Sequence, residues 1–110
     1  MTNAQHIPGP WQVEARTGYN ERQNCEVLVI STCEYFIAEV LSDSTIADDD
    51  IANARLIAAS PEMLDELKRE FQWLEHIRPQ IKAPSSVMIG FEQAISSIRA
   101  AIAKATGQAA

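Results

Sequence analysis

Residues 52–67 read Ala-Asn-Ala-Arg-Leu-Ile-Ala-Ala-Ser-Pro-Glu-Met-Leu-Asp-Glu-Leu. The first eight residues are mostly alanine, leucine and isoleucine, a composition that favours a helix. Ser60-Pro61 then interrupts the run. A serine before a proline is typical of a helix start, because serine caps free N–H groups and proline is tolerated in the first turn. The stretch therefore predicts a short helix over about 50–59, a break or kink at Ser60, and a second helix over about 61–77.

Downstream of this stretch, apolar residues recur every three or four positions, which is the spacing of one helix face. The stripe of the second helix consists of Leu64, Leu67, Phe71, Leu74 and Ile77, and that of a last helix of Met88, Phe91, Ile95, Ile98 and Ile102. Ser85 or Ser86 can cap the last helix, and Gly107 stands where a left-handed helix end is common. We expect an αα-hairpin over about 61–77 and 86–105, with a frayed tail over 106–110.

Upstream, the sequence favours strands separated by short turns. Residues 1–10 end in Pro-Gly-Pro, which predicts an extended lead-in. Alternating and β-branched residues predict strands over about 11–16, 24–31 and 35–41. Because the connections are short, an antiparallel meander is the simplest topology. We expect one α+β domain over residues 1–110, with the αα-hairpin packed on one face of the sheet.

The formal net charge of −6 is distributed unevenly. Residues 1–50 contain nine acidic and two basic residues, whereas residues 51–110 contain six acidic and seven basic residues. The first half would repel a phosphate backbone and attract a basic partner. We therefore expect no direct nucleic-acid binding. We also expect no membrane insertion, because no apolar run approaches the roughly 20 residues that span a bilayer, and the N-terminus lacks the layout of a signal peptide.

Residues with metal-binding or catalytic chemistry are few. Cys25 and Cys33 are eight positions apart, unlike the close pairs of zinc sites, and free thiols are expected. His6 and His76 form no recognisable catalytic pattern with them. The acidic residues 48–50 lack the central glycine and terminal glutamate of a calcium loop, and capping of the following helix accounts for them. We expect no metal, no cofactor and no enzymatic activity.

Two motifs resemble a group of small phage and prophage proteins. The first motif is His6-Ile7-Pro8-Gly9-Pro10-Trp11, and the second is the helical stretch from Ala52 to Leu64. Proteins of the group open with a TPGPW-type segment and carry an ANARLIAAAPELLEAL-type helix. This chain has Ile7 where many have threonine, and Ser60 where many have alanine. The resemblance implies a phage or prophage origin in a bacterium, but it implies no particular activity. Because neither a membrane-spanning run nor a signal peptide is expected, we expect the bacterial cytoplasm as the location.

The first functional hypothesis is a small, non-enzymatic phage protein that binds a host protein. Such a protein could inhibit a defence nuclease by placing an acidic surface in its basic nucleic-acid channel. The candidate contact residues are Glu26, Glu39, Asp48, Asp49, Asp50 and, as an apolar anchor, Trp73. The helices also carry apolar residues that could form a homodimer.

The alternative hypothesis is a protein that binds or sequesters a small, nucleotide-type ligand. His6, Trp11 and Arg55 would supply its stacking and polar groups. A structural interpretation competes at each position, because Trp11 can close one end of the core and Arg55 can pair with an acidic residue on the surface.

Overall fold

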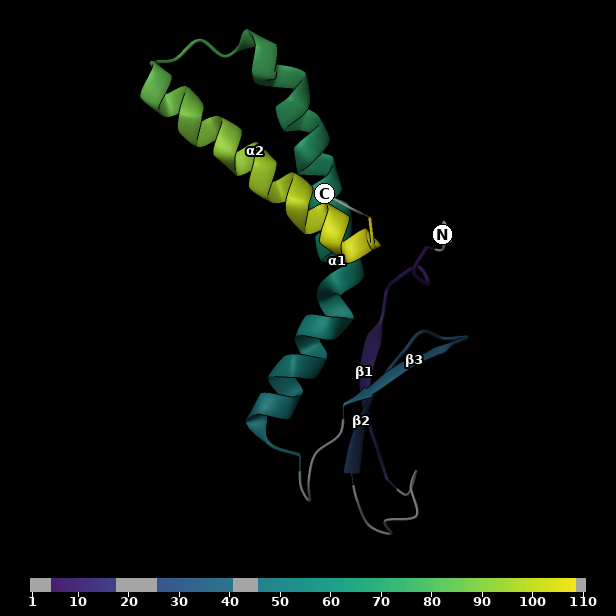
Figure 1. Ribbon diagram of the computed structural model, residues 1–110. Coiled ribbons are helices and arrows are strands. Elements are labelled where there is room, and N and C mark those ends of the chain that lie inside the picture. The colour runs from purple at the N-terminus through teal and green to yellow at the C-terminus, as the bar shows by residue number, and fades with distance from the viewer. Residues whose placement is uncertain (1–4, 18–25, 41–45, 109–110) are drawn as a thin grey trace. The chain divides into compact units, whose positions relative to one another are not determined.

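The structure of the chain, a computed structural model, describes residues 5–17, 26–40 and 46–108 (Figure 1). The elements are β1 (Gln12–Thr17), β2 (Glu26–Ser31), β3 (Phe36–Val40), α1 (Asp48–Ile77), the 3-10 turn η1 (Arg78–Gln80) and α2 (Ser85–Thr106). The strands pair antiparallel in the order β1-β2-β3. The predicted α+β class and the meander are therefore confirmed. Residues 24, 25 and 41 of the predicted strands, and 42–45 of the acidic loop, lie outside the described residues.

The central strand β2 provides the core of the sheet. Its register places Ile30 opposite Val13 of β1 and opposite Ala38 of β3. Val29 and Ile30 are both fully buried, at 0% exposure. Because consecutive side chains of a strand point to opposite faces, both faces of β2 are covered. This agrees with the apolar residues on both faces of the strand.

The chain divides into two compact units, which are described separately. The sheet unit, His6–Glu62, contains the three strands and the first half of α1. The helical unit, Met63–Ala110 with Met1–Gln5, contains the second half of α1, η1 and α2. The predictions of a single domain and of a hairpin packed on the sheet stay predictions.

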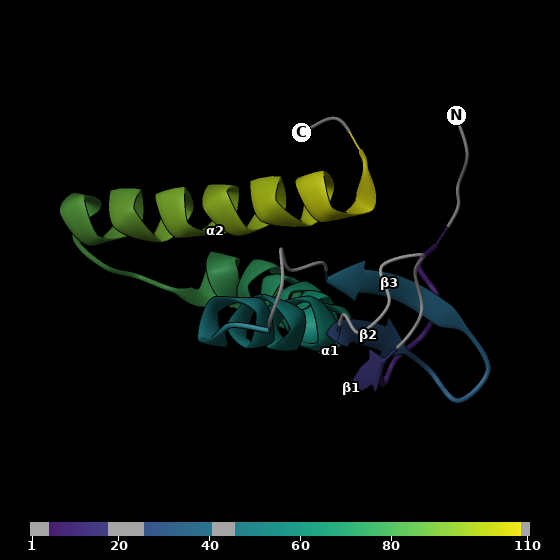
Figure 2. The ribbon, with the colours of Figure 1, turned by 90° about the horizontal axis from the view of Figure 1, so that it is seen from below.

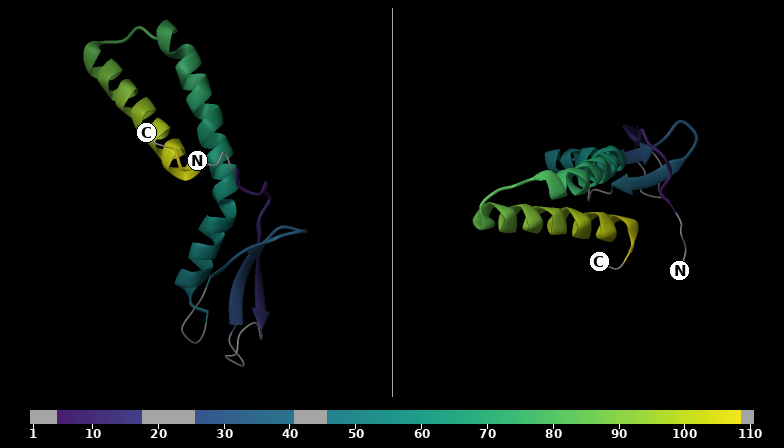
Figure 3. Two further views of the ribbon diagram at one scale, coloured as in Figure 1. Left: turned by 45° about the vertical axis from the view of Figure 1, so that its right-hand side comes forward. Right: turned by 90° about the horizontal axis from the view of Figure 1, so that it is seen from above.

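In the sheet unit, the first half of α1 runs beside the strands (Figures 1 and 3). Its buried residues are Ala54, Ala58 and Pro61, which are spaced four and three positions apart on one helix face. Alanine side chains are small, so the helix backbone can approach its neighbours closely. The alanine-rich composition of this stretch thus favours a helix and also sets its packing face.

A break or kink was predicted at Ser60, and the break is wrong, because α1 continues through Pro61 from Asp48 to Ile77. Proline has no N–H to donate to the carbonyl four residues earlier, which belongs to Ile57. The Ser60 hydroxyl donates to that carbonyl oxygen instead, at 2.6 Å. The residue expected to cap a new helix therefore repairs the hydrogen-bond ladder of a longer one.

In the helical unit, the second half of α1 and α2 form the antiparallel hairpin that the periodicity predicts (Figures 1 and 2). Leu64 and Ile95, from the two predicted stripes, are buried. The predicted serine cap of α2 is wrong, because Pro84 is the capping residue and no side chain caps the helix start. The end of α2 is as predicted, because the backbone of Gly107 has a left-handed conformation, with a φ of 72°.

Candidate interaction surface

The carboxylates at the start of α1 have two different roles. The Asp50 side chain accepts a hydrogen bond from the Ala47 N–H at 2.9 Å and so closes the first turn of the helix. Asp48 and Asp49 are exposed and make no such bond. Helix capping, the structural interpretation of this cluster, therefore applies to Asp50, while Asp48 and Asp49 remain available to a partner.

Two further carboxylates lie on the β2–β3 hairpin. Glu39 is half-buried in β3, and Glu34 is exposed in the turn before it. Of the predicted contact residues, the side chain of Glu26 lies outside the described part of the structure. Glu34 was missed at the sequence level, because a turn residue was interpreted only as a connector. The sequence feature that could have indicated Glu34 as a contact residue is its position directly before two aromatic residues, Tyr35 and Phe36.

Four carboxylates of the sheet unit have no ionic partner among the described residues. Within 26–40 and 46–62, no lysine or arginine lies at ion-pair distance from Glu34, Glu39, Asp48 or Asp49. The described ranges of this unit contain eight acidic residues and two arginines, Arg16 and Arg55. Glu34, Glu39, Asp48 and Asp49 therefore contribute a negative potential that no ion pair within 26–40 and 46–62 neutralises.

The helical unit shows the opposite arrangement. Arg78 forms a two-pronged pair with Glu92, with a distance of 2.7 Å from Nε to Oε1, and its Nη1 lies 3.7 Å from Glu75. Arg99 lies 3.2 Å from the other oxygen of Glu75, and Arg69 pairs with Glu66. Residues 63–108 contain five acidic and six basic residues. Charge in this unit is thus largely balanced within the fold.

The turn between β2 and β3 has a defined geometry. The Thr32 hydroxyl oxygen accepts hydrogen bonds from the N–H groups of Glu34, at 3.2 Å, and Tyr35, at 2.9 Å. The Thr32 N–H donates to the Tyr35 carbonyl oxygen at 2.8 Å. Tyr35 and Phe36 are 54% and 49% exposed. The turn therefore holds two half-exposed aromatic residues and an exposed carboxylate.

Of the three residues in the ligand-binding hypothesis, two lie together and the third does not contact them. His6 and Trp11 do meet, with ring centroids 6.1 Å apart in an edge-to-face arrangement. The Trp11 indole N–H is engaged internally, because it donates to the Ile7 carbonyl oxygen at 3.0 Å. Arg55 is exposed, and no contact in the described residues joins it to either ring. The alternative stays a prediction, with two of its three residues together.

The two motifs of the phage resemblance contact each other. A Cβ built on Gly9 would lie 3.3 Å from Pro61 Cβ and 2.8 Å from Glu62 Oε1. The Pro8-Gly9-Pro10 segment therefore lies directly against α1, within the sheet unit. A larger residue in place of Gly9 would crowd this contact, which gives the first motif a structural role.

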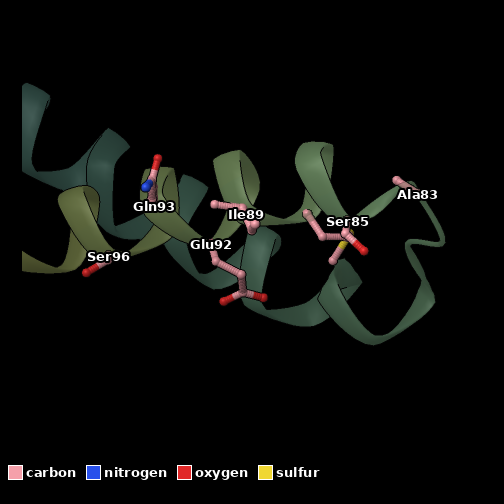
Figure 4. A pocket seen from close by; sticks show the side chains of 7 residues that line it. Ala83, Ser85, Ile89, Glu92, Gln93 and Ser96 are labelled. Carbon is pink, nitrogen blue, oxygen red and sulfur yellow. The ribbon is translucent and has the colours of Figure 1, made fainter.

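A shallow groove lies on α2 and the residues before it (Figure 4). Its volume is about 510 Å³, and it is lined by Ala83, Ser85, Met88, Ile89, Glu92, Gln93 and Ser96. Glu92, its charged residue, is bound to Arg78. None of His6, Trp11 and Arg55 lines the groove, so it gives the ligand hypothesis no additional support.

The remaining candidates are isolated. Trp73, the predicted anchor, is 55% exposed on α1, and Cys33 is an exposed free thiol in the β2–β3 turn, whereas Cys25 lies outside the described residues. In residues 5–17, 26–40 and 46–108 no three histidine, cysteine or acidic side chains gather as metal ligands would. Within the same described ranges, neither helix has both the length and the apolar character to cross a membrane.

The chain has no match among the curated proteins or the solved structures. A profile of one protein family, described as Salmonella phage P22 protein Y8K6, matches residues 1–109. The match includes both motifs and both units. It agrees with the resemblance to small phage-encoded proteins, and the chain belongs to this phage P22 protein Y8K6 family.

Proposed function

We propose that this phage-family protein is a non-enzymatic interaction protein whose sheet unit binds a basic surface of a host protein and inhibits it. The observation that carries the proposal is the contrast between the two units. Three of the five acidic side chains in residues 63–108 pair with arginine, whereas Glu34, Glu39, Asp48 and Asp49 of the sheet unit lack a basic partner within the described residues.

The physical reason is electrostatic complementarity. Carboxylates that are left unpaired on one surface keep their field in solution, which attracts a basic patch and accelerates association. A host protein that binds nucleic acid has such a patch, because it neutralises phosphates with lysine and arginine. Occupation of that patch by the sheet unit would block the nucleic acid without any catalytic group.

The test compares two variants that each lose three negative charges. The first is the triple variant Glu34→Gln, Asp48→Asn and Asp49→Asn, in which exposed carboxylates of the sheet unit are neutralised. The matched control is Asp65→Asn, Glu66→Gln and Glu70→Gln, at exposed positions of the helical unit. Tagged proteins are incubated with a bacterial lysate, and captured proteins are quantified by mass spectrometry at about 0.15 M and about 0.5 M salt.

We expect a basic, nucleic-acid-binding protein to be captured by the wild type and by the control variant. The sheet-unit variant should lose about tenfold of this capture, which corresponds to about 1.4 kcal/mol. The higher salt concentration should release the partner, because it shortens the screening length. Equal loss in the two triple variants, or capture that salt does not change, would contradict the proposal.

A further inference from the structure

The β2–β3 turn, Thr32–Phe36, is a hydrogen-bonded tip of the hairpin. Three hydrogen bonds close it, two to the Thr32 hydroxyl oxygen and one from the Thr32 N–H to the Tyr35 carbonyl oxygen. A segment that is ordered before binding loses little conformational entropy when it docks. The tip therefore meets one requirement of an efficient contact site.

The side chains at this tip have the character of interface anchors. Tyr35 is 54% exposed although its ring is large and mostly apolar. Aromatic residues are enriched in protein interfaces, where they contribute apolar area together with a polar end. Glu34, the preceding residue, is exposed as well. An exposed aromatic residue thus directly follows an exposed acidic residue in the chain, at the end of a hairpin.

The helical unit contains an example of an arginine that is bound by an aromatic ring and a carboxylate together. The guanidinium carbon of Arg99 lies 5.5 Å from the centroid of the Phe71 ring, and its Nη2 lies 3.2 Å from Glu75. In this arrangement a guanidinium stacks on an aromatic face while it pairs with a carboxylate. At the β2–β3 turn the aromatic ring and the carboxylate are present, and no arginine of the described residues approaches them.

We infer that the Thr32–Phe36 tip binds an arginine side chain on the surface of the partner protein. The Tyr35 ring would stack on the guanidinium, and the Glu34 carboxylate would pair with it. The inference rests on the proposed function, because it names the point at which the acidic sheet unit contacts its basic partner. Arginine is preferred to lysine, because the planar guanidinium stacks and donates two parallel hydrogen bonds, whereas an ammonium group is a compact, strongly hydrated charge.

The experiment titrates the full chain, labelled with ¹⁵N, with a heptaarginine peptide and separately with a heptalysine peptide. Amide signals report both the affinity and the site. We expect heptaarginine to shift the signals of Thr32–Phe36 and to bind about twofold to fivefold more tightly than heptalysine, as a cation–π contact of about 0.5–1 kcal/mol implies. The Tyr35→Ala variant should lose this preference.

The control is Trp73→Ala, because Trp73 is 55% exposed and lies in the helical unit. This variant should keep the arginine preference and the shifts at the tip. A second variant, Thr32→Val, removes the hydroxyl acceptor of the turn and keeps Tyr35 and Glu34. It should reduce the arginine preference, because the tip is no longer ordered before binding.

The outcomes separate this inference from the proposed function. Equal affinity for the two peptides, with shifts at Asp48 and Asp49 and none at the turn, would overturn the arginine tip and leave the acidic surface supported. A preference for heptaarginine that is as large in Tyr35→Ala as in the wild type would also overturn the arginine tip. A lack of binding to either peptide would overturn both proposals.

Discussion

Gly9 has the tightest surroundings of the described glycines. Its backbone lies so close to α1 that a Cβ would meet Glu62 Oε1 at 2.8 Å and Pro61 Cβ at 3.3 Å. Gly90, in the second turn of α2, has nothing within 4 Å of such an atom. The two glycines therefore have opposite roles, since one permits a contact and the other only weakens a helix.

The Gly9→Ala substitution is expected to lower the free energy of unfolding by about 1 kcal/mol, because the added methyl group overpacks the contact with Pro61 and Glu62. Urea unfolding followed by circular dichroism measures the change. In a Glu62→Ala background, Gly9→Ala should destabilise the protein less, because the atom nearest to the added methyl group, Glu62 Oε1, is then absent. The matched control, Gly90→Ala, should raise the free energy of unfolding by about 0.5–1 kcal/mol. Equal effects of the two alanine substitutions would contradict the role given to Gly9.

At the scale of elements, periodicity predicted the strands, the hairpin of helices and the end of α2 at Gly107, because these follow from local apolar spacing and a left-handed cap. The break at Ser60 was wrong, because sequence rules could not show that its hydroxyl would bond to the Ile57 carbonyl oxygen. The contact roles of Asp48 and Asp49 stay predictions. Glu34 and Tyr35 become candidates only with the structure, since the exposure of a turn depends on how the hairpin closes.

The contact between η1 and α2 provides an element-scale prediction. The Arg78–Glu92 pair joins residues that are 14 positions apart, and both side chains are 40% exposed. A double-mutant cycle with Arg78→Ala and Glu92→Ala should give a coupling energy of about 0.5–1 kcal/mol, reduced by salt because the pair is partly solvated. The control cycle, Arg69→Ala with Glu66→Ala on one face of α1, should give about 0.3 kcal/mol. A coupling that is no larger than the control would show that the pair does not hold the hairpin.

At the scale of the whole molecule, α1 is the element that belongs to both units. The boundary between Glu62 and Met63 falls inside this continuous helix, one residue after Pro61. The Ser60 hydroxyl compensates for the N–H that proline lacks at this position. Because helix formation is cooperative along its hydrogen-bond ladder, loss of order on one side of the boundary should be transmitted to the other.

The two tryptophans allow this coupling to be measured, because Trp11 lies in the sheet unit and Trp73 in the helical unit. A Trp11→Phe background leaves Trp73 as the reporter. In this background Ile30→Ala, which opens a cavity at a residue of 0% exposure in β2, should destabilise the protein by about 2–5 kcal/mol.

We expect the urea transition reported by Trp73 to shift together with the far-ultraviolet circular dichroism transition, although the cavity lies in the other unit. The exposed residue Leu56 supplies the control, since Leu56→Ala should change the stability by less than about 0.5 kcal/mol. A Trp73 transition that stays in place when Ile30 is truncated would mean that the two units unfold independently, so that the chain is two domains that share a helix. A common shift would mean that α1 makes them one cooperative domain.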